Sequence, residues 1–276
     1  MIDVGLHPQL DPETYYGLPF ASNSRLSLLK KSPLHLRHAL DAGDFDTEAL
    51  RFGRDAHVCI LEPHRFDDEY AIGPDVKLNT GAGKEAWAQF ESENEGKTLV
   101  RGGPGADMLA MRRAVLAHPM ANTLLSGSGA NELSLIWDDP TTGVRCKARA
   151  DRFTAAAGVA SFVDLKGVRD ASPYGMSKAV AQYGWHRQAA MYIDGAFAIE
   201  PANRWYIIIA VEKTPPYAVG VYEMNEEAID AGRRERDKLL KLWMQCHERD
   251  EWPGYGDGIL DLNLPGWAID NWEKIA

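Results

Sequence analysis

Apolar and polar positions in the first half of the chain follow mainly a helical period. Apolar side chains recur every three or four residues, and Ser, Asn, Thr or Pro residues stand where these runs begin or end. The spacing predicts helices over residues 22–42 (two short helices), 47–62 and 106–117. Residues 73–105 carry many Gly, Lys, Glu and Asn with weak periodicity, so we expect an exposed insertion there, with a short helix near residues 84–90.

The period changes to two near residue 132, which is typical of strands. Strands are predicted over residues 132–137, 144–153, 159–166, 204–211 and 217–224. A turn over residues 138–143 joins the first two strands into a hairpin, and the almost wholly apolar run 204–211 predicts a central strand. Two helices are predicted, one from Ser172 to about Ile199 with a bend at Gly184, and one from Glu226 to His247.

Length and composition favour one large domain with insertions over two equal domains. The 276 residues are 45% hydrophobic and 25% charged, an ordinary balance for a protein that buries a sizeable core. The expected parts of this single domain are an N-terminal helical part (1–72), the exposed insertion (73–105), a core with the predicted sheet (106–250) and a Pro- and Gly-rich tail (251–276).

Several signals narrow the class of protein. No stretch approaches the roughly 20 consecutive apolar residues of a membrane span, and residues 1–4 lack the pattern of a secretory signal, so we expect a cytoplasmic location and no membrane partner. Cys59, Cys146 and Cys246 stand far apart, so they form no CxxC pair, zinc knuckle or iron–sulfur set, and we expect buried free thiols. The formal net charge of −10 argues against coating nucleic acid by bulk electrostatics, although it can hide a basic channel and fits carboxylates gathered around a metal.

Basic side chains concentrate near the first predicted helices. They are Arg25, Lys30, Lys31, Arg37, Arg51 and Arg54. Such a group could contact phosphates or form a solvated helix face, and the residues alone favour the solvated face.

Alternation along two predicted strands carries the main chemical inference. In the strand over residues 144–153, small or apolar side chains occupy one face and charged side chains the other. The charged face comprises Arg145, Lys147, Arg149 and Asp151. In the next strand Asp164 and Lys166 project together from one face, while Val163 and Leu165 occupy the opposite, core-facing side.

If these two strands pair, Asp151 and Asp164 come close enough to share a hard divalent cation, with Lys166 beside it. Phosphodiester cleavage needs such an arrangement, because the metal supplies Lewis acidity and lowers the pKa of a bound water. The lysine can orient that water or offset the charge that grows in the transition state. Oxygen ligands favour Mg²⁺ or Mn²⁺ over zinc.

The order and spacing of these residues resemble those in the core of the PD-(D/E)XK nucleases. The pattern is Asp151-x12-Asp164-Leu165-Lys166, followed by a capped helix that carries Gln188-x3-Tyr192. Further segments are similar to phage exonucleases of the exonuclease VIII (RecE) type. They are SRLSLLKKSP (24–33), FGRDAH (52–57), LEP (61–63), YGWHRQAAMY (183–192) and LPGWA (264–268). The similarity spans nearly the whole chain.

The resemblance implies an α/β fold with a restriction-endonuclease-like core, in which helices flank a mixed central β-sheet. It also implies a set of metal ligands for Mg²⁺, with Mn²⁺ as a substitute: His57 from a helix, Asp151, Asp164 and the carbonyl of Leu165. Lys166 would be the catalytic lysine. The residues implied to support the active site or the scissile phosphate are Glu132, Gln188 and Tyr192.

The same resemblance implies an activity. Exodeoxyribonucleases of this type degrade one strand of linear double-stranded DNA from its 5′ end and leave a 3′ overhang, which a single-strand annealing protein uses in recombination. Double-stranded DNA ends and an annealing protein are therefore the implied partners. A homo-oligomeric ring around DNA, and a phage or prophage origin in a bacterial host cell, are implied as well.

Two positions depart from the family pattern. Members commonly have Thr or Ser after the catalytic lysine, whereas this chain has Gly167, which lacks a hydroxyl that could contact phosphate or water. The second acid is Asp164 where many members have Glu, so the ligand is shorter by one methylene. Two other functions stay open: a DNA-binding or assembly protein that does not cleave, and a structure-specific endonuclease that uses the same residues.

Structural interpretations stand beside the implied roles. A histidine on an apolar helix face is commonly a hydrogen-bonded core residue, but the resemblance favours a metal ligand for His57. For Glu132, an ion pair with Arg145 or Lys147 across the hairpin is as well supported as a role at the active site. Tyr183 is predicted to be a core aromatic, because it stands at helical spacing.

Overall fold

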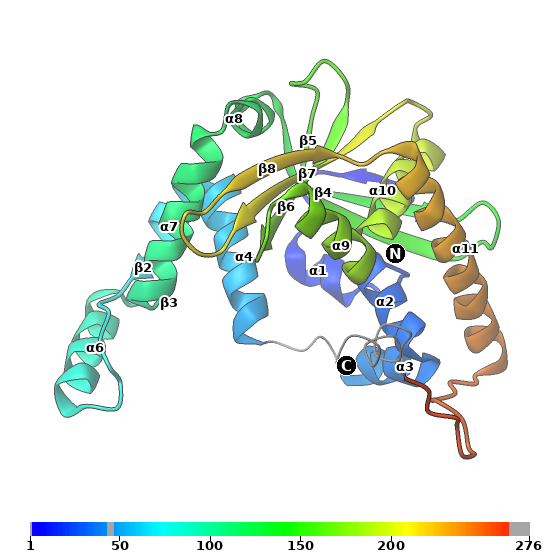
Figure 1. Cartoon of the computed structure of the whole chain (residues 1–276), viewed down its shortest axis with the longest axis horizontal. Helices are drawn as coiled ribbons and strands as arrows, with labels where there is room; N and C mark the ends of the chain where they lie inside the picture. The colour runs from blue at the N-terminus through cyan, green and yellow to red at the C-terminus, as the bar shows by residue number, and fades with distance from the viewer. Residues whose placement is uncertain (1, 43–46, 265–276) are drawn as a thin grey trace, which may run out of the picture.

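The structure, a computed structural model, describes residues 2–42 and 47–264. Within them one sheet has the strand order β1-β4-β5-β6-β7-β8, in which β6 and β7 are parallel and the other neighbours antiparallel (Figure 1). A separate small sheet pairs β2 with β3 in parallel. The strands are β1 Gly5–His7, β2 Tyr70–Ile72, β3 Thr98–Val100, β4 Gly129–Asp138, β5 Arg145–Thr154, β6 Ser161–Val168, β7 Trp205–Glu212 and β8 Val219–Glu223. The predicted mixed sheet is confirmed.

Helices precede, interrupt and follow these strands. Those before β4 are α1 Pro12–Gly17, α2 Asn23–Lys31, α3 Pro33–Ala42, α4 Glu48–Leu61, α5 Pro63–Glu69, α6 Gly81–Glu93, α7 Gly102–Ala117 and α8 Pro119–Ser126. The later ones are α9 Pro173–Tyr183, α10 Trp185–Ile199 and α11 Glu226–Arg249. Among the described residues, no helix is long and apolar enough to cross a membrane. Residues 265–276 of the expected tail, with most of the LPGWA segment, lie outside the described residues.

Helices cover both faces of the sheet (Figure 1). On one face α10 packs against β4, β5 and β7, and α2 and α11 pack against α10; on the other face α4 and α8 contact β5, and α7 contacts β7. The strand β7 contributes to both cores. Tyr206, Ile208 and Ala210 belong to the first cluster, and Ile207, Ile209 and Val211 belong to the second. A strand buried on both faces has to be apolar at every position, so its continuous apolar run correctly predicted a central strand.

Some short elements escaped the sequence pattern. Pro63 and Pro119 follow the ends of α4 and α7, as predicted, but each also begins a further helix, because proline suits the first turn of a helix. The insertion over residues 73–105 holds β3 and a longer helix than predicted, α6, and β2 directly precedes it; this part of the chain projects away from the main sheet (Figure 1). The three cysteines are buried and free, as expected.

The predicted bend at Gly184 is a break between two helices. Gly184 has φ 68°, a left-handed conformation that glycine adopts without strain, and it separates α9 from α10. Tyr183 therefore ends α9, so its helical spacing to Tyr192 does not run through one continuous helix. Its side chain is 56% exposed, and the prediction that Tyr183 is a core aromatic was wrong.

A buried arginine joins three helices that are distant in sequence. Arg187 on α10 is 1% exposed, and it pairs with Glu235 on α11. Its Nε donates to Oδ1 of Asn23 (2.9 Å), and its Nη2 donates to Oγ of Ser27 (2.5 Å), both on α2. Because a buried guanidinium is tolerated only when it is paired and hydrogen-bonded, these contacts fix α10 relative to α2 and α11.

Close packing of α10 on α11 gives a prediction for two glycines. A Cβ on Gly232 of α11 would lie 2.2 Å from the carbonyl oxygen of His186, whereas a Cβ on Gly53 of α4 would meet nothing within 4 Å. We expect Gly232→Ala to lower the free energy of unfolding by about 1–3 kcal/mol through overpacking. The same substitution at Gly53 should raise it by up to about 1 kcal/mol, because alanine favours the helix.

Urea denaturation followed by circular dichroism measures both values. Equal effects of the two substitutions would contradict this account of the α10–α11 contact.

Candidate active site

The strands β5 and β6 separate where the two predicted acids stand. Their antiparallel ladder covers only Arg152–Thr154 with Ser161–Val163, and the next pair in that register would be Asp151 and Asp164. The amide of Leu165 donates instead to Oδ2 of Asp151, over 2.7 Å. The carboxylate thus takes the place of a backbone partner, and it holds the two strands together at their fork.

Asp151 lies between the fork and the helix α4. His57 of α4 approaches it, with 3.5 Å between Nδ1 and Oδ2 of Asp151. Burial, together with the negative charges of Asp164 and Glu132, raises the pKa of Asp151 to about 6, although His57 and Lys166 oppose this shift. The side chain is 15% exposed, so little water is available to stabilise its charge.

Asp164 of β6 is almost fully buried beneath α10, with 2% exposure. Its Oδ2 lies 2.6 Å from Nζ of Lys166, and its Oδ1 accepts a hydrogen bond from Nε2 of Gln188 over 2.8 Å. Oε1 of Gln188 in turn accepts a hydrogen bond from Lys166 over 3.4 Å. The predicted acid, lysine and glutamine therefore contact one another.

Two tyrosines complete the environment of Asp164. Tyr192, one turn beyond Gln188 on α10, donates its hydroxyl to the carbonyl of Arg149 over 2.6 Å. Tyr206 of β7 was not predicted from the sequence, because in its strand it reads as one more core residue. Burial first, and then the charge of Asp164, raises the pKa of Tyr206 well above its usual range. Tyr206 thus stays a neutral phenol beside the carboxylate.

Alternation along β5 breaks at Asp151. Ala150 shares a face with Cys146 and Ala148, as predicted, yet Phe153, three residues on, packs against the same cluster. On the neighbouring strand Glu132, which stands opposite Asp151, has φ 53° and interrupts the β4–β5 ladder. A left-handed residue inside a strand is strained, and such irregularities gather at functional sites. Strict alternation, as assumed from the sequence, could not reveal this distortion.

Glu132 pairs with a basic residue, but with neither of the two considered from the sequence. Its Oε2 accepts a hydrogen bond from Nε of Arg149 over 2.6 Å. Arg145 pairs with Asp138, and Lys147, which is 3% exposed, donates to the carbonyls of Tyr15 and Leu18. The charged face predicted for this strand is therefore engaged inside the protein.

The basic residues of the N-terminal helices are largely engaged as well. Arg25 donates to the carbonyl of Phe20 over 2.8 Å, and Arg37 pairs with Asp41. Nζ of Lys30 lies 3.0 Å from Glu235. Several of the basic side chains expected on a solvated helix face therefore contact other groups of the protein.

The donor atoms at the fork suit a hard divalent cation. Oδ2 of Asp164 is buried and, within the described residues, accepts no hydrogen bond, although Lys166 offsets its charge. The amide of Leu165 faces Asp151, and because amide and carbonyl of one strand residue point to the same edge, its carbonyl faces the fork as well. Oxygen atoms of this kind are the ligands that Mg²⁺ prefers.

Side chains alone do not complete a metal site. In residues 2–42 and 47–264, no three His, Cys, Asp or Glu side chains lie close enough together to hold a metal ion. A cation at Asp151 and Asp164 would therefore need the Leu165 carbonyl or water molecules as further ligands, and water ligands are usual for Mg²⁺.

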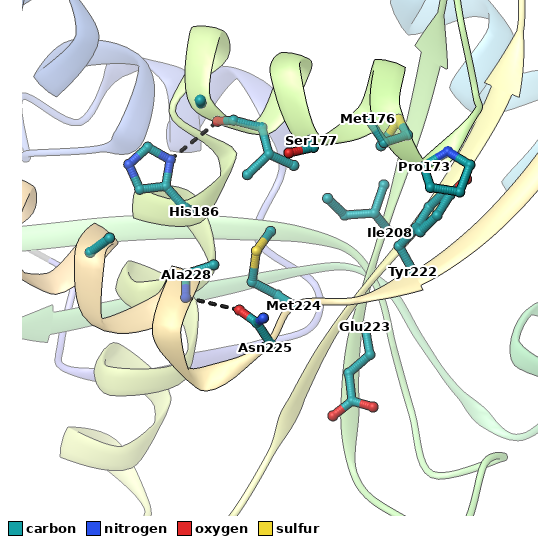
Figure 2. Close-up of a pocket in the computed structure, with 13 residues that line it drawn as sticks. Pro173, Met176, Ser177, His186, Ile208, Tyr222, Glu223, Met224, Asn225 and Ala228 are labelled. Atoms are coloured by element: carbon teal, nitrogen blue, oxygen red, sulfur yellow. Dashed lines mark hydrogen bonds between the residues drawn. The ribbon is translucent and has the colours of Figure 1, made fainter.

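The fork is separate from the apolar cavity shown in Figure 2. That cavity, of about 460 Å³, lies between α9, β8 and the first turns of α11, and its walls include Met176, Ile208 and Met224. His186 at its edge hydrogen-bonds through Nδ1 to the carbonyl of Val180 over 3.1 Å. None of the predicted metal ligands lines this cavity.

Comparisons with known proteins identify the family and the fold. The model of a family described as "PDDEXK-like domain of unknown function (DUF3799)" matches residues 22–260. A solved structure of a candidate exonuclease from Eubacterium rectale is 13% identical, with a TM-score of 0.62 over 95% of this chain and 98% of that one. That of an alkaline exonuclease from Laribacter hongkongensis is 12% identical, with a TM-score of 0.37 over 86% and 97%. No curated protein matches the sequence.

The raised pKa of Asp151 predicts a stabilising substitution. A carboxyl whose pKa rises from 3.8 unfolded to about 6 folded binds its proton more tightly in the folded state, so stability is lost as pH rises through 6. Asp151→Asn keeps an acceptor for the amide of Leu165 and removes the charge. In EDTA at pH 8 it should therefore raise the free energy of unfolding by about 1–3 kcal/mol.

The difference between variant and wild type should shrink as pH falls from 7 towards 4. Urea denaturation of both proteins in EDTA across this range checks the expectation. An asparagine variant less stable than wild type at pH 8 would show that the charged form of Asp151 is the favoured one.

Proposed function

We propose that this chain, which belongs to the family of PDDEXK-like domains of unknown function (DUF3799), is a metal-dependent deoxyribonuclease. The observation that carries the proposal is the fork of β5 and β6, where Asp151 accepts from the amide of Leu165, Lys166 contacts Asp164, and Asp151 lies close enough to Asp164 to feel its charge. Two carboxylates and an amine at one point are what hydrolysis of a phosphodiester needs. The family fold supports the proposal, because nucleases of this fold generally use divalent metal ions.

Each residue of the fork has a proposed role. Asp151, Asp164 and the carbonyl of Leu165 would hold Mg²⁺ or Mn²⁺, and His57 would be a further ligand from α4. When bound, this ion supplies Lewis acidity and a water of lowered pKa. Lys166 would hold the attacking water or the phosphate oxygens through its ammonium.

The neighbouring residues would keep these groups in place. Gln188 restrains both Asp164 and Lys166, because its amide contacts each of them. Tyr192 joins α10 to β5 through the carbonyl of Arg149, and Glu132 keeps Arg149 paired beside the site. Such support matters, because catalytic groups have to be held within a fraction of an ångström of their productive positions.

The finer proposal concerns the substrate. We propose double-stranded DNA ends, degraded from 5′ to 3′ to leave 3′ overhangs for strand annealing. The similarity of several sequence segments to RecE-type exonucleases supports it. The same similarity supports a homo-oligomeric ring, an annealing partner and a phage or prophage origin in the host cytoplasm. A structural likeness to the Eubacterium rectale protein, at 13% identity, supports the fold alone.

Replacing the central acid or the lysine tests the chemistry. Asp164→Ala and Lys166→Ala should each reduce Mg²⁺-dependent release of nucleotides from linear duplex DNA by at least about a hundredfold. Asp68→Ala, which removes an exposed carboxylate of α5, is the matched control and should retain activity. Retained activity in purified, folded Asp164→Ala protein would refute the proposal.

The DNA substrate separates the three candidate functions. Linear duplexes labelled at one end at a time should lose 5′ nucleotides first, and covalently closed circles should stay intact. Cleaved circles would indicate an endonuclease. If no DNA is cleaved, titration calorimetry with Mg²⁺ on wild type and Asp151→Ala separates a nuclease from a protein that only binds DNA. Loss of Mg²⁺ affinity in Asp151→Ala indicates a nuclease site, whereas equal affinity in the two proteins indicates a DNA-binding protein.

A further inference from the structure

Two aromatic rings stand in contact at the break between α9 and α10. The left-handed turn at Gly184 places Tyr183 and Trp185 with ring centroids 5.4 Å apart and planes inclined by 30°. Trp185 is half-buried, whereas Tyr183 is 56% exposed. We call this stacked pair the aromatic ledge. A large ring left this open, and already stacked on a second one, offers a flat apolar surface to a ligand.

The ledge adjoins the proposed catalytic lysine. Nζ of Lys166 lies 5.3 Å from the centre of the Trp185 ring, and 2.6 Å from Oδ2 of Asp164. Gln188, which follows Trp185 by less than one helical turn, also contacts Lys166. The ammonium thus lies between the carboxylate of Asp164 and the aromatic ledge. A phosphate at Lys166 would carry its own sugar and base within reach of the rings.

The exposure of Tyr183 is not explained by its own contacts. Across the described parts of the chain its hydroxyl forms no hydrogen bond, and its ring contacts that of Trp185. Lys166, by comparison, has Trp185, Asp164 and Gln188 as partners. The outer ring of the ledge, more than half exposed, is therefore open to contact with a bound molecule.

We propose that the aromatic ledge stacks an unpaired base of the DNA strand that is being cut, next to the phosphate at Lys166. The inference rests on the proposed nuclease function and adds a substrate requirement. Bases inside a duplex already have neighbours on both faces, so a ring can stack on a base only where the strand end is frayed or splayed. Stacking of this kind tolerates any base, because every base has a flat face. The site thus takes a single-stranded end of any sequence.

A set of variants of the full chain isolates the ring. Tyr183→Ala removes it, and Tyr183→Phe keeps the ring without the hydroxyl. Tyr174→Ala is the matched control, because Tyr174 is on the same helix, is 69% exposed and contacts a lysine, with Nζ of Lys178 4.1 Å from its ring. It differs from Tyr183 in having no contact with Trp185 or Lys166 among the described residues.

The first measurement needs no cleavage. Linear duplexes carry 2-aminopurine, a base whose fluorescence changes when it stacks, either at the 5′-terminal position or in the middle, and they are titrated with protein in EDTA. Wild type, Tyr183→Phe and Tyr174→Ala should change the signal of the terminal base alone. Tyr183→Ala should abolish that change. Equal signals for Tyr183→Ala and Tyr174→Ala would overturn the inference, as would no signal with wild type.

The second measurement uses Mg²⁺ and linear duplex. Loss of one base–aromatic stack should raise KM by about five- to a hundredfold in Tyr183→Ala, while kcat stays within about twofold and Tyr183→Phe stays near wild type. If wild type is active and Tyr183→Ala has the same KM, the proposed role of the aromatic ledge is refuted, whereas the proposed nuclease function stands. If wild type does not cleave DNA but its terminal-base signal still depends on Tyr183, the proposed nuclease function is refuted. The aromatic ledge is then supported as a DNA-binding site.

Discussion

Where β5 and β6 part, two carboxylates have to lie close together in a region that excludes most water. The arrangement is unfavourable for the fold alone, because burial and the neighbouring charges raise the pKa of Asp151. It persists because Asp151 also performs a structural task, as the acceptor for the amide of Leu165. The same oxygen thus closes the sheet and belongs to the candidate site.

The residues around the fork restrain it from both faces of the sheet. On one face α10 supplies Gln188 and Tyr192, which contact Asp164 and the backbone of β5. On the other, α4 brings His57 to Asp151. The central strand β7 supports both arrangements, because it is buried on each side. The energy that holds charged groups in this position comes from the two apolar clusters that enclose the sheet.

The sequence predicted the main strands, the long helices and the residues that meet at the fork, because alternation and helical spacing are local properties. Pairing of β5 with β6 followed from their adjacency. The end of the ladder, the left-handed Glu132 and the role of Tyr206 beside Asp164 did not follow, since each depends on contacts between distant segments. Tyr183 was wrongly predicted to be buried, because its helical spacing to Tyr192 implies one continuous helix, whereas Gly184 separates α9 from α10.

The contacts of Arg187 bear on how much of the chain is needed for a working site. This arginine immediately precedes Gln188, and besides its ion pair with Glu235 its guanidinium bonds to Asn23 and Ser27 of α2, more than 150 positions earlier in the sequence. A fragment that began after α2 would leave a cation buried without these partners, next to the glutamine that orients Asp164. The helix α2 therefore helps to position the residues beside Asp164, although it stands far from them in the sequence.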